Sequence, residues 1–203
     1  MKASAEERLL LPGPAGNLEV VVNDPGARRQ GLALIAHPHP LHGGSLDNKV
    51  VQTLAKTFFR QACVAVRMNF RGVGASDGVF DGGHGEAQDW LVVAQALRDR
   101  FGDLPLSLAG FSFGAFVQAQ VAQELRPQRL ILVAPAVGRF PLPEVPEHTL
   151  VVHGEQDDVV ALSEVLDWAR PQSLPVVVLP GTGHFFHGKL VELASIVQRS
   201  CPC

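Results

Sequence analysis

Six short apolar runs constrain the fold of this chain more than any other feature of its sequence. Each run holds three to five residues, is rich in branched side chains and contains almost no polar position. Strands that are buried on both faces have this pattern, and such strands occur in parallel sheets. The runs span residues 32–36, 64–66, 106–109, 130–134, 150–152 and 176–179.

The segments between these runs have the apolar spacing of helices. Residues 51–58, 90–101 and 190–197 each place apolar side chains three or four positions apart. Alternating strands and helices predict an α/β fold with a mostly parallel central sheet and helices on both faces. Residues 9–11 and 18–22 flank a segment rich in proline and glycine, which predicts an antiparallel hairpin at one edge of the sheet.

The length of the chain indicates the number of domains, and its cysteines indicate whether disulfides or a zinc site are expected. A chain of 203 residues can bury one core but is short for two domains, so we expect residues 1–203 to form a single domain. Cys63 lies beside an apolar run and is expected in the core. Cys201 and Cys203 stand at the end of the chain, and the three cysteines form neither a disulfide framework nor a zinc site.

The charge balance indicates the kind of partner. Seventeen basic and 20 acidic residues give a net charge of -3, without a cluster of basic residues. We therefore expect a small-molecule ligand, and neither a nucleic acid nor a membrane as partner. Residues 1–10 carry charges where a signal peptide needs an apolar stretch, so a cytoplasmic location is expected. The oligomeric state stays open, with a homodimer as one alternative.

One pentapeptide has the pattern of a nucleophile elbow. Ser112 stands between Gly110 and Gly114, after an apolar run and before a helical segment at 115–125. A sharp turn from strand to helix exposes such a serine and requires small residues two positions before and after it. An acid and a histidine follow later in the chain, each after its own apolar run, in the order serine, acid, histidine.

Five motifs together resemble one family of proteins. They read HPHPLHGGSLDNKVV, NFRGVGASDG, GFSFGA, HGEQDD and GTGHFF, and they extend over nearly the whole chain. In this order the motifs resemble small bacterial serine α/β-hydrolases without a lid, which are related to dienelactone hydrolases and acyl peptidases. Dienelactone hydrolases use a cysteine where this chain has Ser112, which argues against their lactone specificity.

The resemblance implies a catalytic triad. Ser112 is the expected nucleophile, His184 the general base and Asp157 the residue that orients it. His187 is the rival base, but it is expected in the first turn of the next helix. Asp158 is the rival acid, but it is expected to cap the helix that begins near residue 160.

The oxyanion hole requires backbone N–H groups. Phe113, which follows the nucleophile, is expected to supply one of them. The other is expected from the loop after the first parallel strand, where Pro38 and Pro40 have no N–H group. His39 matches the donor position of similar hydrolases, and Leu41 is the alternative.

Three histidines in this loop, His37, His39 and His42, raise the question of a metal site. Their spacing is not a helical i, i+4 pair, and no carboxylate or cysteine lies beside them. The triad also offers a complete mechanism without a metal. We therefore expect neither a metal nor a cofactor.

A helical lid is not expected. The connection at 134–149, where many α/β-hydrolases carry a lid, is short and rich in proline. The site should therefore be open and bordered only by loops. Five phenylalanines are expected to line a shallow cleft there: Phe111, Phe113, Phe140, Phe185 and Phe186.

These expectations lead to a functional hypothesis. The chain is expected to be a serine hydrolase that cleaves small, short-acyl carboxylic esters through an acyl-enzyme intermediate. A thioesterase or short-peptide acyl hydrolase would use the same machinery. A binding protein on a hydrolase scaffold is the alternative outside catalysis, and the intact set of Ser112, Asp157 and His184 argues against it.

Overall fold

Eight strands form one sheet in residues 6–200, the part of the chain that the computed structural model describes. The strand order is β1-β2-β4-β3-β5-β6-β7-β8. Their bounds are β1 (Glu6–Gly13), β2 (Gly16–Asn23), β3 (Gly31–Ala36), β4 (Cys63–Met68), β5 (Leu106–Phe111), β6 (Arg129–Val133), β7 (Leu150–Gly154) and β8 (Val176–Leu179).

The sheet is mostly parallel. Strands β3 to β8 run in the same direction, whereas β1 and β2 form an antiparallel hairpin and β2 pairs antiparallel with β4. The six apolar runs correspond to β3 to β8, and the hairpin lies at the sheet edge. The expected α/β-hydrolase fold class is confirmed.

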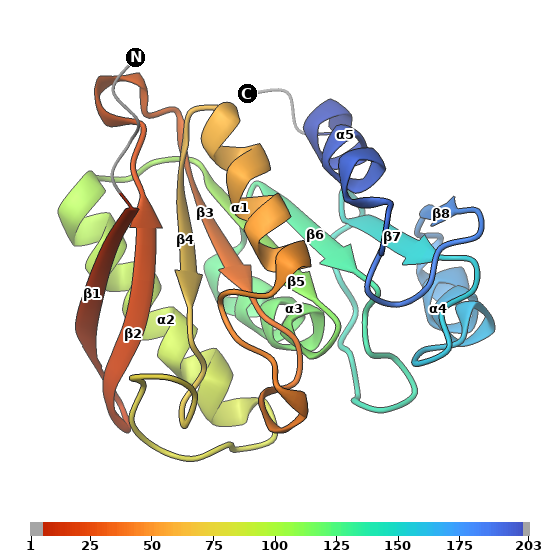
Figure 1. The fold of residues 1–203 in the computed structure, drawn as a ribbon, viewed down its shortest axis with the longest axis horizontal. Helices are drawn as coiled ribbons and strands as arrows, with labels where there is room; N and C mark the ends of the chain where they lie inside the picture. Colours follow the sequence, from red (N-terminus) through yellow and green to blue (C-terminus); the bar gives the residue numbers. More distant parts are fainter. Residues whose placement is uncertain (1–5, 201–203) are drawn as a thin grey trace.

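Helices cover both faces of the sheet. Figure 1 shows α1 (Lys49–Arg60) and α5 (Leu190–Ser200) on one face, with α2 (His84–Phe101) and α3 (Phe113–Leu125) on the other. Helix α4 (Leu162–Ala169) packs beside β7 through an apolar cluster that includes Val151 and Val165. Short 3-10 turns complete the list: η1 (Gly26–Arg28), η2 (Pro40–His42) and η3 (Arg170–Gln172). Within residues 6–200, no helix has the length and apolar character of a membrane span.

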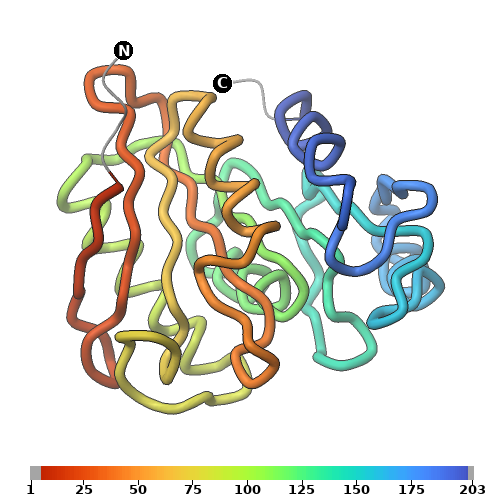
Figure 2. Tube along the Cα trace, in the orientation of Figure 1, coloured from red at the N-terminus to blue at the C-terminus, as the bar shows by residue number. Residues whose placement is uncertain are grey.

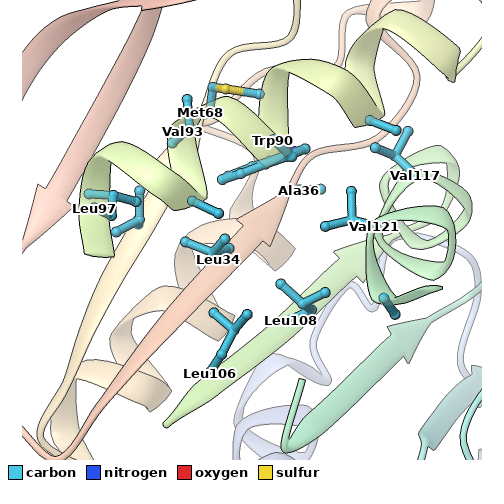
Figure 3. Close-up of a cluster of buried hydrophobic side chains, with 14 of the residues drawn as sticks. Leu34, Ala36, Met68, Trp90, Val93, Leu97, Leu106, Leu108, Val117 and Val121 are labelled. Carbon is cyan, nitrogen blue, oxygen red and sulfur yellow. The ribbon is translucent and has the colours of Figure 1, made fainter. Parts of the chain in front are cut away.

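Two apolar layers hold the helices against the sheet. Figure 3 shows the layer under α2 and α3, where Trp90 and Val121 lie over Leu34 and Leu108 of the central strands. Burial of side chains of this size contributes about 1.5 to 3 kcal/mol each to folding. Cys63 is buried in the layer under α1, as expected. Cys201 and Cys203 lie outside the described residues.

The carboxyl ends of the parallel strands carry the long loops. Figure 2 shows the loops after β3, β4 and β6 gathered at one end of the sheet. The loop between β6 and β7 contains turns and bends but no helix or strand. This structure confirms the absence of a lid. In open α/β sheets this end is where ligands bind, and Ser112, Asp157 and His184 all lie in loops there.

Candidate active site

Ser112 occupies a strained turn between β5 and α3. Its φ and ψ angles are 56° and -116°, a backbone conformation that non-glycine residues rarely adopt. The Ser112 N–H donates to the carbonyl oxygen of Val133 at 2.9 Å, which ties the turn to β6. Ser112 stands at the cap position of α3, yet its hydroxyl makes no capping hydrogen bond. The hydroxyl group is therefore available for another partner.

Close backbone packing explains the two glycines of the elbow. A Cβ atom on Gly110 would overlap the carbonyl group of Gly114. A Cβ atom on Gly114 would overlap the carbonyl oxygens of Ala36 and His37 at the end of β3. Any side chain at either position would therefore push α3 away from the sheet and displace Ser112.

Three side chains form a hydrogen-bonded chain in this site. The Ser112 Oγ lies 3.0 Å from His184 Nε2, and His184 Nδ1 lies 2.7 Å from Asp157 Oδ2. Because the carboxylate only accepts hydrogen bonds, His184 donates from Nδ1, and its Nε2 then accepts the serine proton. All three residues are buried, with at most 8% of each exposed.

The environment of Asp157 keeps its carboxylate ionised. Burial alone would raise the pKa of Asp157, but the hydrogen bond from His184 and those from backbone N–H groups outweigh it and hold the pKa below its ordinary value. The backbone donors are Val160 at 2.8 Å and Val159 at 2.9 Å, both to Oδ1. His153 lies behind the carboxylate, with Nε2 3.5 Å from Oδ2. Burial lowers the pKa of His153, which keeps this neighbour neutral.

Backbone hydrogen bonds connect the acid loop to the histidine loop. Gln156 N–H donates to Thr182 O at 2.9 Å, and Gly181 N–H donates to the Glu155 carboxylate at 2.8 Å. The two loops approach closely at Gly154, where the Cβ atom of any other residue would overlap the carbonyl of Thr182. These contacts fix the distance between Asp157 and His184.

The two rival residues lie apart from the hydrogen-bonded chain. Asp158 is exposed and does not cap α4, whose cap position is Ala161 without a side-chain hydrogen bond. The expected capping role of Asp158 is therefore wrong, since Asp157 makes the hydrogen bonds to the N–H groups that follow. His187 is exposed in a turn before α5 and stacks on Phe185, so its expected place in the helix is also wrong.

His37 has a structural position beneath the site. Its Nε2 accepts from Phe70 N–H at 3.0 Å, and its Nδ1 donates to Pro38 O at 2.7 Å. Both nitrogens are thus used by the backbone, and the ring is not available to a metal ion. In residues 6–200, no three side chains of His, Cys, Asp or Glu are grouped to hold a metal.

The burial of His37 predicts a pH-dependent stability. Burial lowers its pKa to about 4, from 6.5. Between these values the unfolded chain binds one more proton than the folded chain, so stability is full above 6.5 and is lost as the pH falls toward 4. The loss from this group is about 3 kcal/mol. Urea unfolding between pH 7 and 4.5 should show a steeper fall in the wild type than in His37→Gln.

The stability of each protein is compared with its own stability at pH 7, so a general destabilisation by His37→Gln does not affect the comparison of the two slopes. A remaining slope in this variant belongs to other groups, such as His153, whose pKa is also lowered by burial. Equal slopes in the two proteins would show that His37 does not stay neutral in the folded state.

Two residues of the cleft are candidates for the oxyanion hole. Residues His39 and Phe113 both line the cleft in front of Ser112, and neither N–H group has a hydrogen-bond acceptor among residues 6–200. The N–H group of Leu41, the alternative donor, is directed at His39 Nδ1 at 3.2 Å. The structure therefore leaves the His39 N–H available and engages that of Leu41.

The cleft has a volume of about 500 Å³. Only three of the five expected phenylalanines line it, Phe113, Phe140 and Phe185. Phe111 and Phe186 are fully buried. Phe111 lies beneath the His184 ring, 5.1 Å between ring centroids. The expectation that all five form the cleft is therefore wrong for these two.

Some residues of the cleft are absent from the sequence-based prediction. His42 and Asn48 line it from the loop after β3, and Arg139 lines it from the loop after β6. A signal for Arg139 exists in the sequence, because it is the only lysine or arginine in residues 134–149 and follows a parallel strand.

Comparisons with known proteins identify the family. The model of the serine aminopeptidase S33 family matches residues 39–148. The crystal structure of a lid-less α/β serine hydrolase from Xanthomonas campestris is 39% identical, with a TM-score of 0.91 over 97% of this chain and 94% of that chain. An α/β serine hydrolase homologue from Coxiella burnetii is 42% identical, with a TM-score of 0.89 over 95% and 96%.

A curated relative extends the comparison. An uncharacterized protein of Rickettsia prowazekii is 29% identical, over 92% of this chain and 84% of its own length. The eight-stranded sheet and the serine elbow agree with the family match, and the missing lid agrees with the Xanthomonas structure. The chain therefore belongs to the serine aminopeptidase S33 family of serine hydrolases with the α/β-hydrolase fold.

Proposed function

We propose that this serine hydrolase is a carboxylesterase for short-acyl esters that acts through an acyl-enzyme intermediate, with Ser112, His184 and Asp157 as the catalytic triad. The observation that carries the proposal is the continuous chain of hydrogen bonds from the Ser112 hydroxyl through His184 to the Asp157 carboxylate. A nucleophile within hydrogen-bond reach of a base that a third group orients is the arrangement that activates serine.

The first half-reaction forms the acyl-enzyme. Ser112 Oγ attacks the ester carbonyl carbon while His184 Nε2 takes the hydroxyl proton. The carbonyl oxygen becomes an oxyanion, which accepts hydrogen bonds from the N–H groups of Phe113 and His39. As the carbonyl bond reforms, the ester bond breaks and His184 gives the proton to the departing alcohol. Asp157 stabilises the imidazolium in between.

The second half-reaction uses water. His184 Nε2 removes a proton from a water molecule, whose oxygen attacks the acyl carbon. The bond to Ser112 then breaks, the proton returns to Oγ, and the carboxylic acid leaves. Both halves use the same donors and the same base, so no cofactor enters the mechanism.

The open cleft supports a preference for short acyl chains. Phe140 and Phe185 supply the aromatic surface, and the β6–β7 loop contains no helix that could cover a long chain. Each methylene group left in water forgoes roughly 0.8 kcal/mol of burial. We therefore expect kcat/KM on 4-nitrophenyl esters to be highest between acetate and butyrate and to decline by decanoate.

A panel of nitrophenyl esters and matched thioesters tests this function. Hydrolysis of the short esters at higher kcat/KM than the thioesters of the same acyl group supports a carboxylesterase. A reversed order would assign the chain to the thioesterases. A kcat/KM that keeps rising to decanoate would show that the loops close over a long chain, and no turnover of any ester would contradict the proposal.

A further inference from the structure

The side chains around the cleft have an unbalanced charge. Arg139 is the one permanently charged side chain among the described residues that line it, and no aspartate or glutamate lines it. His39, His42 and Asn48 supply further polar groups. Asn48 is also the N-cap residue of α1, and α3 begins at Phe113, so the positive ends of two helix dipoles face the same region.

The position of Arg139 is fixed by the backbone. Its Nε and Nη2 both donate to the carbonyl oxygen of Val159, at 3.2 and 2.8 Å. Gly138 precedes it with a φ of 75°, a left-handed conformation that allows the loop to turn there. The Nη1 group has no hydrogen-bond partner within residues 6–200. One end of the guanidinium is therefore held while the other retains its donors.

Arg139 forms no ion pair with an acid in residues 6–200. Glu164 of α4 packs against Gly138 but makes no ion pair with Arg139 within 4 Å, as judged over the described residues. Asp157 does not line the cleft and is occupied by His184 and by two backbone N–H groups. Arg139 thus differs from Arg71, which is paired with the buried Asp89. A charge without a partner at a binding cleft attracts an ion of opposite sign.

We propose that Arg139 binds a carboxylate on the substrate, so that the preferred esters carry an anionic group in their acyl or alcohol part. This inference rests on the proposed esterase function. A planar guanidinium matches the two oxygens of a carboxylate. The same charge disfavours peptides with a free amino terminus, because an aminopeptidase site needs acceptors or an acid for the ammonium group. The family match thus gives the fold and chemistry of the site, while Arg139 selects an anionic ligand.

Two matched pairs of esters test the charge preference. The 4-nitrophenyl monoester of adipic acid is compared with 4-nitrophenyl hexanoate, which places the carboxylate on the acyl side. The ester 4-acetoxybenzoate is compared with its methyl ester, which places it on the alcohol side. Wild-type kcat/KM should favour the anionic member of at least one pair, and the pair that responds identifies the side. Raising the salt concentration should reduce this preference.

Variants assign the preference to Arg139. Arg139→Gln should lower the anionic-to-neutral ratio of kcat/KM by about 10-fold, mainly through KM, and Arg139→Lys should retain part of it. Arg60→Gln is the matched control, because Arg60 is exposed at the far end of α1, about 18 Å along the helix from Asn48. An unchanged ratio in Arg139→Gln would overturn the proposal.

Binding without turnover separates this proposal from the esterase function. The Ser112→Ala protein is titrated with monomethyl adipate and with neutral methyl hexanoate, and nuclear magnetic resonance reports binding. Tighter binding of the anion that disappears in the Ser112→Ala, Arg139→Gln protein supports the anionic site even if no ester is hydrolysed. Equal binding of both probes contradicts the anionic site and leaves the esterase function to its own test.

Discussion

Ser112→Ala is expected to abolish ester hydrolysis. The substitution removes the oxygen that forms the acyl-enzyme, and the loss of a serine nucleophile of this kind costs about 10⁴ to 10⁶-fold in kcat. Alanine retains the Cβ atom that the turn at φ 56° already accommodates, so the fold should remain. Initial rates on 4-nitrophenyl butyrate, with thermal melting of the same samples, measure both effects.

Covalent labelling gives an independent measure of the same prediction. A fluorophosphonate forms a bond from phosphorus to an activated serine oxygen while fluoride leaves, and Ser112 is the only serine in residues 6–200 whose hydroxyl makes a hydrogen bond to a histidine nitrogen, at 3.0 Å. Ser163→Ala is the control, because Ser163 is an exposed serine on α4. Labelling that survives Ser112→Ala but is lost in Ser163→Ala would show that the assigned nucleophile is wrong.

The fold class could be read from the sequence because the apolar pattern is tied to it physically. A strand covered by helices on both faces needs apolar residues at nearly every position, and the six runs that become β3 to β8 have this property. Strand β8 has the same apolar pattern but a different burial. It is an edge strand, and its residues Val176, Val177 and Val178 are only half-buried. Periodicity predicts which residues form a strand, but not where the strand lies in the sheet.

The residues of the site could be predicted because parallel strands deliver their loops to one end of the sheet. Ser112, Asp157 and His184 each follow a strand, and the structure brings their side chains into hydrogen-bond contact. Their catalytic roles remain a prediction. The order of serine, acid and histidine along the chain does not give side-chain contacts. The sequence therefore predicts a helix cap at Asp158, whereas the cap position of α4 is Ala161.

Features that depend on loop conformation could not be predicted. Phe186 follows His184 by two residues, yet a φ of 53° turns its side chain into the core, and the sequence gives no sign of this turn. Phe111 belongs to β5, so the pleat of the sheet, rather than its closeness to Ser112, decides the face to which it points. Arg139 reaches the cleft through its contact with Val159, which is distant in sequence.

Asp157→Asn is expected to reduce kcat by about 10⁴-fold. An amide at this position can donate to His184 Nδ1, which would place the proton on Nε2 and leave no acceptor for the Ser112 hydroxyl. It also removes the negative charge that stabilises the imidazolium. Asparagine keeps an oxygen that can accept from Val159 and Val160, so folding should be affected far less than turnover. Steady-state kinetics and urea unfolding of the same protein distinguish the two effects.

Asp158→Asn provides the matched control for this prediction. Asp158 is the next residue in the chain and carries the same carboxylate, but it is exposed and takes no part in the contacts of His184. Its substitution should change kcat less than about 3-fold, because exposed substitutions of this kind alter little. A larger loss in Asp158→Asn than in Asp157→Asn would move the acid to Asp158. Equal and small losses would mean that His184 is oriented by its packing between Phe111 and Phe185 rather than by a carboxylate.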